Sequence, residues 1–77
     1  FAIGFPKNID ILSYRLNIFD RWGGKVYVSS DSFDSWDGTK NNHQLPVGVY
    51  FYSLYIRYRD SFREADEILT GEFLLYQ

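Results

Sequence analysis

The chain has 77 residues, which allow one small domain and exclude a two-lobed enzyme with a cleft between its halves. Hydrophobic residues make up 45% of it and aromatic residues 21%, a composition too apolar for a disordered segment. The formal net charge of −2 argues against a nucleic-acid partner, and no apolar run is long enough to span a bilayer as a helix.

Apolar and polar residues alternate with a period of two through much of the chain, which predicts an all-β fold. The first hairpin is expected in residues 14–29, with a turn at residues 20–24. In its return strand, alternation places Val26 and Val28 on one face and Tyr27 on the other.

Residues 30–44 are polar and have the composition of a loop, but two large apolar side chains interrupt them. Phe33 and Trp36 are therefore expected to pin this loop onto the core. The segment Leu-Pro-Val-Gly at residues 45–48 predicts a tight turn before the next strand.

The longest strand is predicted for residues 49–58, with apolar character on both faces, as in a central strand. Residues 59–67 are charged and favour a solvated loop over a short helical turn. The last strand is expected over residues 68–77, where Gly71 indicates a bulge or a close approach of the backbone.

These elements predict a small antiparallel immunoglobulin-like β-sandwich, with a candidate fifth strand at residues 1–5. The whole chain, residues 1–77, is interpreted as a single domain. Because it starts at Phe1, we expect it to be a piece of a longer protein whose first strand can lie upstream.

The residues that enzymes and metal sites need are sparse in this chain. His43 is the only histidine and lies in a polar loop, and no phosphate-binding glycine loop precedes a helix. Asp31, Asp34 and Asp37 are spaced by three rather than two, which fits turn formers better than a calcium loop. With no cysteine either, the sequence predicts no enzyme activity, no cofactor and no metal.

Three short signatures follow one another in a fixed order. They are Asn-Ile-Phe-Asp-Arg-Trp-Gly at residues 17–23, Trp-Asp-Gly-Thr at residues 36–39, and Leu-Pro-Val-Gly-Val-Tyr-Phe-Tyr at residues 45–52. In this order they resemble the gliding motility-associated C-terminal domain family, the type B sorting domain of type IX secretion in Bacteroidota. Asp20 stands where the family usually has Asn, Val49 where it has Thr, and Gln77 where it commonly has Arg or Lys.

The resemblance implies a C-terminal sorting domain that directs a covalently attached N-terminal cargo domain through the periplasm to the cell surface or the medium. Its implied partners are the type IX translocon and its outer-membrane shuttle protein, with no catalytic activity in the domain itself. The candidate recognition residues are those of the signatures and of the last strand: Arg21, Trp22, Gly23, Trp36, Asp37, Gly38, Thr39, Pro46, Gly48, Gly71, Phe73 and Leu75.

Other interpretations of the same residues stay open at this stage. Core packing is favoured over direct recognition for Trp22, Trp36 and Tyr50, and Arg21 is expected to stack on Trp36 because neighbouring strand residues point apart. The many aromatic residues also fit a carbohydrate-binding or adhesive β-sandwich, and a plain immunoglobulin-like spacer would have the same strand pattern.

Overall fold

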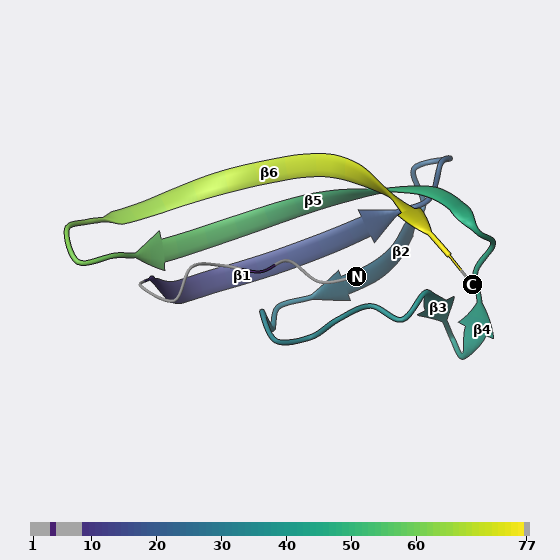
Figure 1. The fold of residues 1–77 in the computed structure, drawn as a ribbon, viewed down its shortest axis with the longest axis horizontal. Coiled ribbons are helices and arrows are strands. Elements are labelled where there is room, and N and C mark those ends of the chain that lie inside the picture. The colour runs from purple at the N-terminus through teal and green to yellow at the C-terminus, as the bar shows by residue number, and fades with distance from the viewer. Residues whose placement is uncertain (1–3, 5–8, 77) are drawn as a thin grey trace.

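A computed structural model describes residue 4 and residues 9–76, and in that part of the chain all regular structure is antiparallel β, as predicted. Four strands form one sheet in the order β2-β1-β5-β6, and two short strands form a separate β3-β4 hairpin (Figure 1). The strands are β1 (Asp10–Phe19), β2 (Lys25–Ser29), β3 (Thr39–Lys40), β4 (His43–Gln44), β5 (Gly48–Arg59) and β6 (Glu64–Leu75). Among these residues, no helix is long and apolar enough to cross a membrane.

The first hairpin forms as predicted, but a bulge changes the faces of its second strand. Phe19 is paired with Lys25 and Ile18 with Tyr27, so Val26 is an extra residue between two pairs. Val26 and Tyr27 therefore both reach the core, whereas Val28 is exposed. The expected alternation of Val26 and Val28 against Tyr27 is wrong, because an inserted residue reverses the pleat beyond it.

The central strand β5 is confirmed, since it pairs with β1 on one side and with β6 on the other. The expected loop at residues 59–67 is confirmed only for residues 60–63, because β5 ends at Arg59 and β6 already begins at Glu64. Residues 60–63 make the turn, in which the Asp60 carboxylate accepts the backbone N–H groups of Phe62 and Arg63. Charged residues fit the strand here because Arg57 on β5 forms an ion pair with Glu64 across the two strands (3.3 Å).

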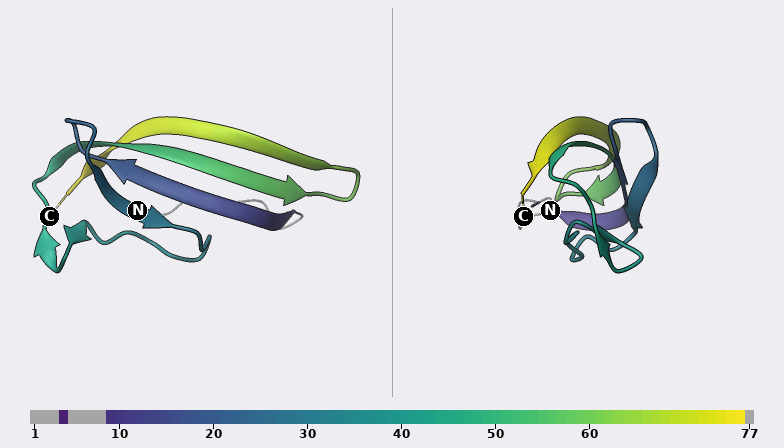
Figure 2. Two further views of the ribbon diagram at one scale, coloured as in Figure 1. Left: turned by 180° about the vertical axis from the view of Figure 1, so that it is seen from behind. Right: turned by 90° about the vertical axis from the view of Figure 1, so that its right-hand side faces the viewer.

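The loop after β2 and the β3-β4 hairpin lie against one end of the sheet (Figures 1 and 2). Trp36 pins this loop as expected, with 4% of its surface exposed, but Phe33 is 94% exposed, so the expectation for Phe33 is wrong. The β3-β4 hairpin was not predicted. Its two-residue connection is Asn41-Asn42, and both residues have positive φ, which asparagine tolerates well.

The core lies between the sheet and this second layer, an arrangement compatible with an immunoglobulin-like sandwich. Alternate residues of β1 and β5 fill it, as the sequence predicted. Its buried hydrophobic residues are Tyr14, Leu16, Ile18, Val26, Trp36, Tyr50, Leu54 and Ile56. The candidate fifth strand at residues 1–5 lies outside the described residues except for Gly4.

Candidate recognition site

Tyr50 links the three sequence signatures at one end of the sheet, because it packs on Trp36 and also lines a small cleft with Trp22. The Trp36 indole packs edge-on against Tyr50 and against Phe73, with ring centroids 5.5 and 6.1 Å apart. Tyr27 lies on the β2 side of the same indole at 6.1 Å. Aromatic pairs in this range add attraction beyond area burial, so β2, β5 and β6 are all attached to the Trp36 loop.

Hydrogen bonds fix the backbone of the Trp-Asp-Gly-Thr signature. The Trp36 indole N–H donates to the carbonyl of Thr39 (3.0 Å), and the Asp37 carboxylate accepts the Thr39 backbone N–H (3.0 Å) and hydroxyl (2.6 Å). The two hydrogen bonds from Thr39 hold the pKa of Asp37 below its ordinary value, and the bond from the Thr39 hydroxyl has the larger effect. Gly38 has a φ of +86°, and a Cβ there would meet the Leu75 side chain at 3.0 Å, so the turn requires glycine.

The aspartates of this loop act as turn formers, as predicted for Asp31 and Asp37. The Asp31 carboxylate accepts the backbone N–H of Phe33 (2.9 Å), in the same way as Asp37 does for Thr39. Asp34 instead accepts the hydroxyl of Ser29 (2.9 Å). In the described part of the chain, no three His, Asp or Glu residues lie close enough to hold a metal ion.

The Asp-Arg-Trp-Gly turn between β1 and β2 is held by Asp20. Its carboxylate accepts the backbone N–H groups of Trp22 (3.0 Å) and Gly24 (2.8 Å). The amide oxygen of an asparagine could accept the same hydrogen bonds, so Asp20 can stand where the family usually has asparagine.

Trp22 is 81% exposed, so the expectation that it packs in the core is wrong. The guanidinium of Arg21 lies 5.0 Å from the centre of the Trp22 ring, and the expected stacking on Trp36 is wrong as well. Neighbouring side chains point apart on a strand, but these two residues belong to a turn, where that rule does not hold. The turn thus presents a cation and an aromatic ring together to solvent.

The predicted recognition residues separate by exposure into three groups. Trp36 and Gly38 are buried, and Thr39, Gly48, Gly71, Phe73 and Leu75 are half-buried. The exposed members are Arg21, Trp22, Gly23, Asp37 and Pro46. Among the predicted recognition residues, Trp22 is therefore the largest exposed apolar side chain, and it lies beside Arg21.

Sequence reasoning missed Val49, an apolar residue beside this turn. Trp22, Pro46 and Val49 line a small cleft of about 60 Å³, and Val49 is 39% exposed. Leu74 of β6 is paired with Val49 and is 54% exposed. The alternation of β5 carried a signal for Val49, because it places this residue on the face opposite the core. We call Arg21, Trp22, Pro46, Val49 and Leu74 the turn surface.

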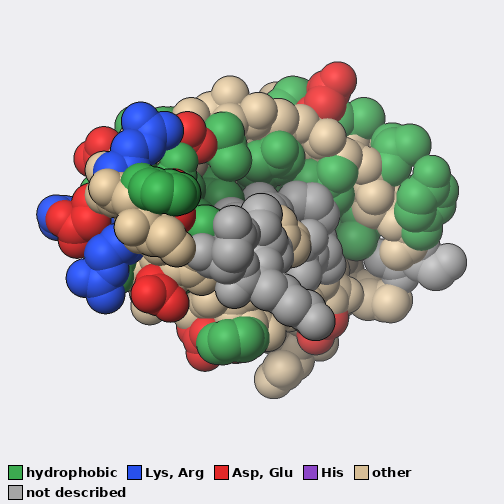
Figure 3. All heavy atoms as spheres, turned by 60° about the vertical axis from the view of Figure 1, so that its left-hand side comes forward, with side chains coloured by type: hydrophobic (Ala, Val, Ile, Leu, Met, Phe, Trp, Pro, Cys, Tyr) green, Lys and Arg blue, Asp and Glu red, His purple; other side chains and the backbone are tan. Residues whose placement is uncertain are grey.

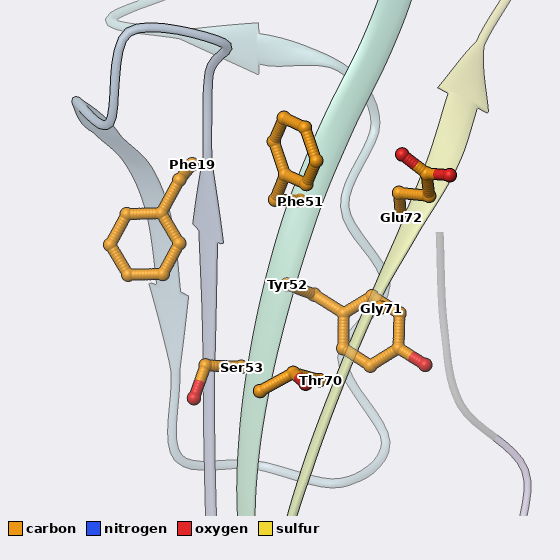
Figure 4. Close-up of a pocket in the computed structure, with 7 residues that line it drawn as sticks. All are labelled: Phe19, Phe51, Tyr52, Ser53, Thr70, Gly71 and Glu72. Atoms are coloured by element: carbon orange, nitrogen blue, oxygen red, sulfur yellow. The ribbon is translucent and has the colours of Figure 1, made fainter.

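The outer face of the sheet also carries an open hollow of about 570 Å³. Phe19 and Phe51, paired on neighbouring strands, stand on one side of it, and Glu72 lies across from Phe51 (Figure 4). The phenol of Tyr52 crosses over Gly71, where an added Cβ would lie 2.7 Å from the ring (Figure 4). Gly71 thus allows a close approach, as predicted, and its pairing continues without a bulge.

The far end of the sheet has a different surface. Charged side chains of both signs gather around the β5-β6 turn (Figure 3), where Arg57 pairs with Glu64 and Arg59 with Asp10. Backbone hydrogen bonds from Phe62 and Arg63 hold the pKa of Asp60 below its ordinary value. The two ends of the domain therefore differ in chemistry, one aromatic and one charged.

In a comparison with protein families, residues 1–69 match the family described as CHU_C type IX secretion signal domain. Neither the curated proteins nor the solved structures contain a match to this chain. The family match covers all three signatures, the turn surface except Leu74, and the start of β6.

Proposed function

Because the chain belongs to the family of type IX secretion signal domains, we propose that the turn surface is where the secretion machinery recognises it. The domain directs export across the outer membrane to the cell surface or the medium, and it acts on a cargo to which it is attached. A secretion signal domain is not normally catalytic. We further propose that the domain contacts an outer-membrane shuttle protein. We also propose that this chain has no catalytic activity.

The exposure of Trp22 carries this proposal. An indole that is 81% exposed gains little for folding, yet the Asp20 carboxylate holds the turn that presents it. Large aromatic residues and arginine are the side chains that most often dominate binding energy in protein interfaces. Arg21 already lies on the Trp22 ring, so both groups can enter a partner's pocket together.

We also propose that residues 1–77 form one sorting domain at the C-terminal end of a larger secreted protein. The packing supports this boundary, because Trp36 binds β2, β5 and β6 into one unit. The carbohydrate-binding alternative is not favoured, since it needs exposed aromatic rings in one plane. Trp22 and Phe62, both highly exposed, lie in turns at opposite ends of the sheet.

The test is export of a reporter fused to the N-terminus of this chain in a host with type IX secretion. We expect the wild-type fusion at the surface or in the medium, and Trp22→Ala to reduce the exported fraction several-fold. Phe33→Ala is the matched control, because Phe33 is also highly exposed and its N–H is likewise accepted by an aspartate two residues earlier.

Both variants should keep the thermal midpoint of the wild type, since neither removes a buried side chain. Wild-type export of the Trp22→Ala fusion would overturn the assignment of the turn surface. Retention of the intact, folded wild-type fusion in the periplasm would instead overturn the secretion function of this chain.

A further inference from the structure

Strand β6 forms one edge of the four-stranded sheet (Figures 1 and 2). Its twelve residues pair with β5 in one continuous register, from Glu64 opposite Arg59 to Leu75 opposite Gly48. Within residues 9–76, no strand pairs with its other side. About half of its backbone N–H and C=O groups therefore point away from the sheet, as on any edge strand.

This edge carries acidic side chains but lacks the proline, lysine and bulge that often block the addition of another strand. It contains no proline and no lysine, and its register has no shift. The opposite edge, β2, is short, begins with Lys25 and contains the bulge at Val26. Of the two edges, β6 is therefore the one to which another strand can pair more readily.

The side chains of β6 define what such a strand must carry. On the outer face, Asp66, Ile68, Thr70, Glu72 and Leu74 follow one another at alternate positions. Ile68 is 71% exposed, and β6 has no basic residue. In the described chain, Glu64 forms the only ion pair on this strand, so neither Asp66, which lies opposite Arg57 of β5, nor Glu72 has a salt bridge.

A second copy of β6 offers no basic residue to this edge, and one of its registers is disfavoured by charge repulsion. Antiparallel pairing of two β6 strands centred on Leu69 would place Asp66 opposite Glu72 of the second copy, twice by symmetry. Like charges directly opposite each other destabilise a strand pair.

We propose that β6 binds an extended basic segment of the secretion machinery by strand addition. In an antiparallel strand, basic residues would lie opposite Glu72 and Asp66, and an apolar residue opposite Ile68. The partner then has two basic residues six positions apart, with the apolar residue four positions after the first. This inference rests on the proposed secretion function and names the chemistry of one partner segment.

The binding test uses a synthetic peptide with Val, Lys, Thr, Val and Lys at alternate positions and serine between them. We expect the peptide to slow amide hydrogen exchange in β6 and to leave the β2 edge unchanged. A peptide with glutamate in place of lysine should not bind. Asp66→Lys/Glu72→Lys should weaken binding at least about fivefold, from two reversed cross-strand pairs.

Glu67→Lys is the control variant, because Glu67 neighbours Asp66 but lies on the other face of the strand. Glu67→Lys should change peptide affinity by less than about twofold, because the charge at residue 67 is exposed and does not lie on the face that contacts the peptide side chains. Equal binding of the lysine and glutamate peptides would overturn the proposal. So would a concentration-dependent dimer with protected β6 amides in the absence of peptide.

Export of the reporter fusion separates this inference from the proposed function. We expect Asp66→Lys/Glu72→Lys to reduce export relative to Glu67→Lys. Normal export of the double variant would overturn strand addition as part of secretion and leave the role of Trp22 intact. If the wild-type fusion were not exported, the secretion function would fail, whatever the peptide measurements gave.

Discussion

Replacing Gly71 with alanine would place a methyl group where the ring of Tyr52 already lies. The new Cβ would be 2.7 Å from Cε1 and from the hydroxyl oxygen of Tyr52, which is half-buried and packs against Phe73. Overpacking of this kind costs about 1–3 kcal/mol. Without the clash, alanine in a strand interior is more stable than glycine by about 0.5–1 kcal/mol.

The sign of the Gly71→Ala effect should therefore depend on Tyr52. In the wild type we expect a net loss of up to about 2.5 kcal/mol in the free energy of unfolding. In a Tyr52→Ala background, the same change should raise it by about 0.5–1 kcal/mol. For a domain of this size, each 1 kcal/mol corresponds to about 4–8 °C in thermal midpoint.

Urea unfolding of the four proteins, followed by circular dichroism, measures this coupling directly as a double-mutant cycle. Equal denaturant slopes in all four would exclude a change in the unfolded ensemble as the cause. The reasoning would be refuted if alanine at position 71 had the same sign in both backgrounds, because the Tyr52 ring would then not be what requires glycine.

Two further changes test individual hydrogen bonds. The hydroxyl of Tyr50 donates to the carbonyl of Pro46 (2.8 Å), so Tyr50→Phe should cost about 0.5–1.5 kcal/mol in thermal unfolding, and an unchanged midpoint would contradict a net stabilising bond. The pKa of Asp37 is lowered in the folded state, so its contribution is present above the unfolded pKa and is lost as pH falls through the folded one. Asp37→Asn keeps an acceptor for Thr39 but does not titrate, so the fall in urea midpoint from neutral to strongly acidic pH should be shallower than in the wild type, and an equal fall would argue against this contribution.

The strands were predictable from the sequence wherever one face of the strand is buried and the other is exposed to solvent. In β5, and in β1 from Ser13 onward, that alternation gives the core residues, whereas the register of β1 against β5 shifts between Ile11 and Ser13. The bulge at Val26 was not predictable, because register in a hairpin depends on the geometry of its turn as well as on side-chain periodicity. The start of β6 was missed because charges lower strand propensity, although an edge strand keeps much of its surface in water.

The candidate site was predictable as a set of motifs but not as a surface. Phe33 and Trp36 look alike in sequence, each a large apolar residue in a polar loop, yet only Trp36 meets Tyr50 and Phe73. Trp22 and Trp36 differ in the same way. Which of the two tryptophans is buried depends on contacts with residues of distant strands. Those contacts cannot be predicted from the local sequence pattern around each tryptophan.

The turn surface forms only in the folded domain, because its residues come from three separate segments. Trp22 comes from the first hairpin, Val49 from the start of β5 and Leu74 from the last strand, so their surface exists only when those segments have met. An unfolded chain contains the same residues but cannot present them at one place. A receptor that binds this surface would therefore distinguish a folded domain from an unfolded one, and export would be restricted to chains whose signal domain had already folded.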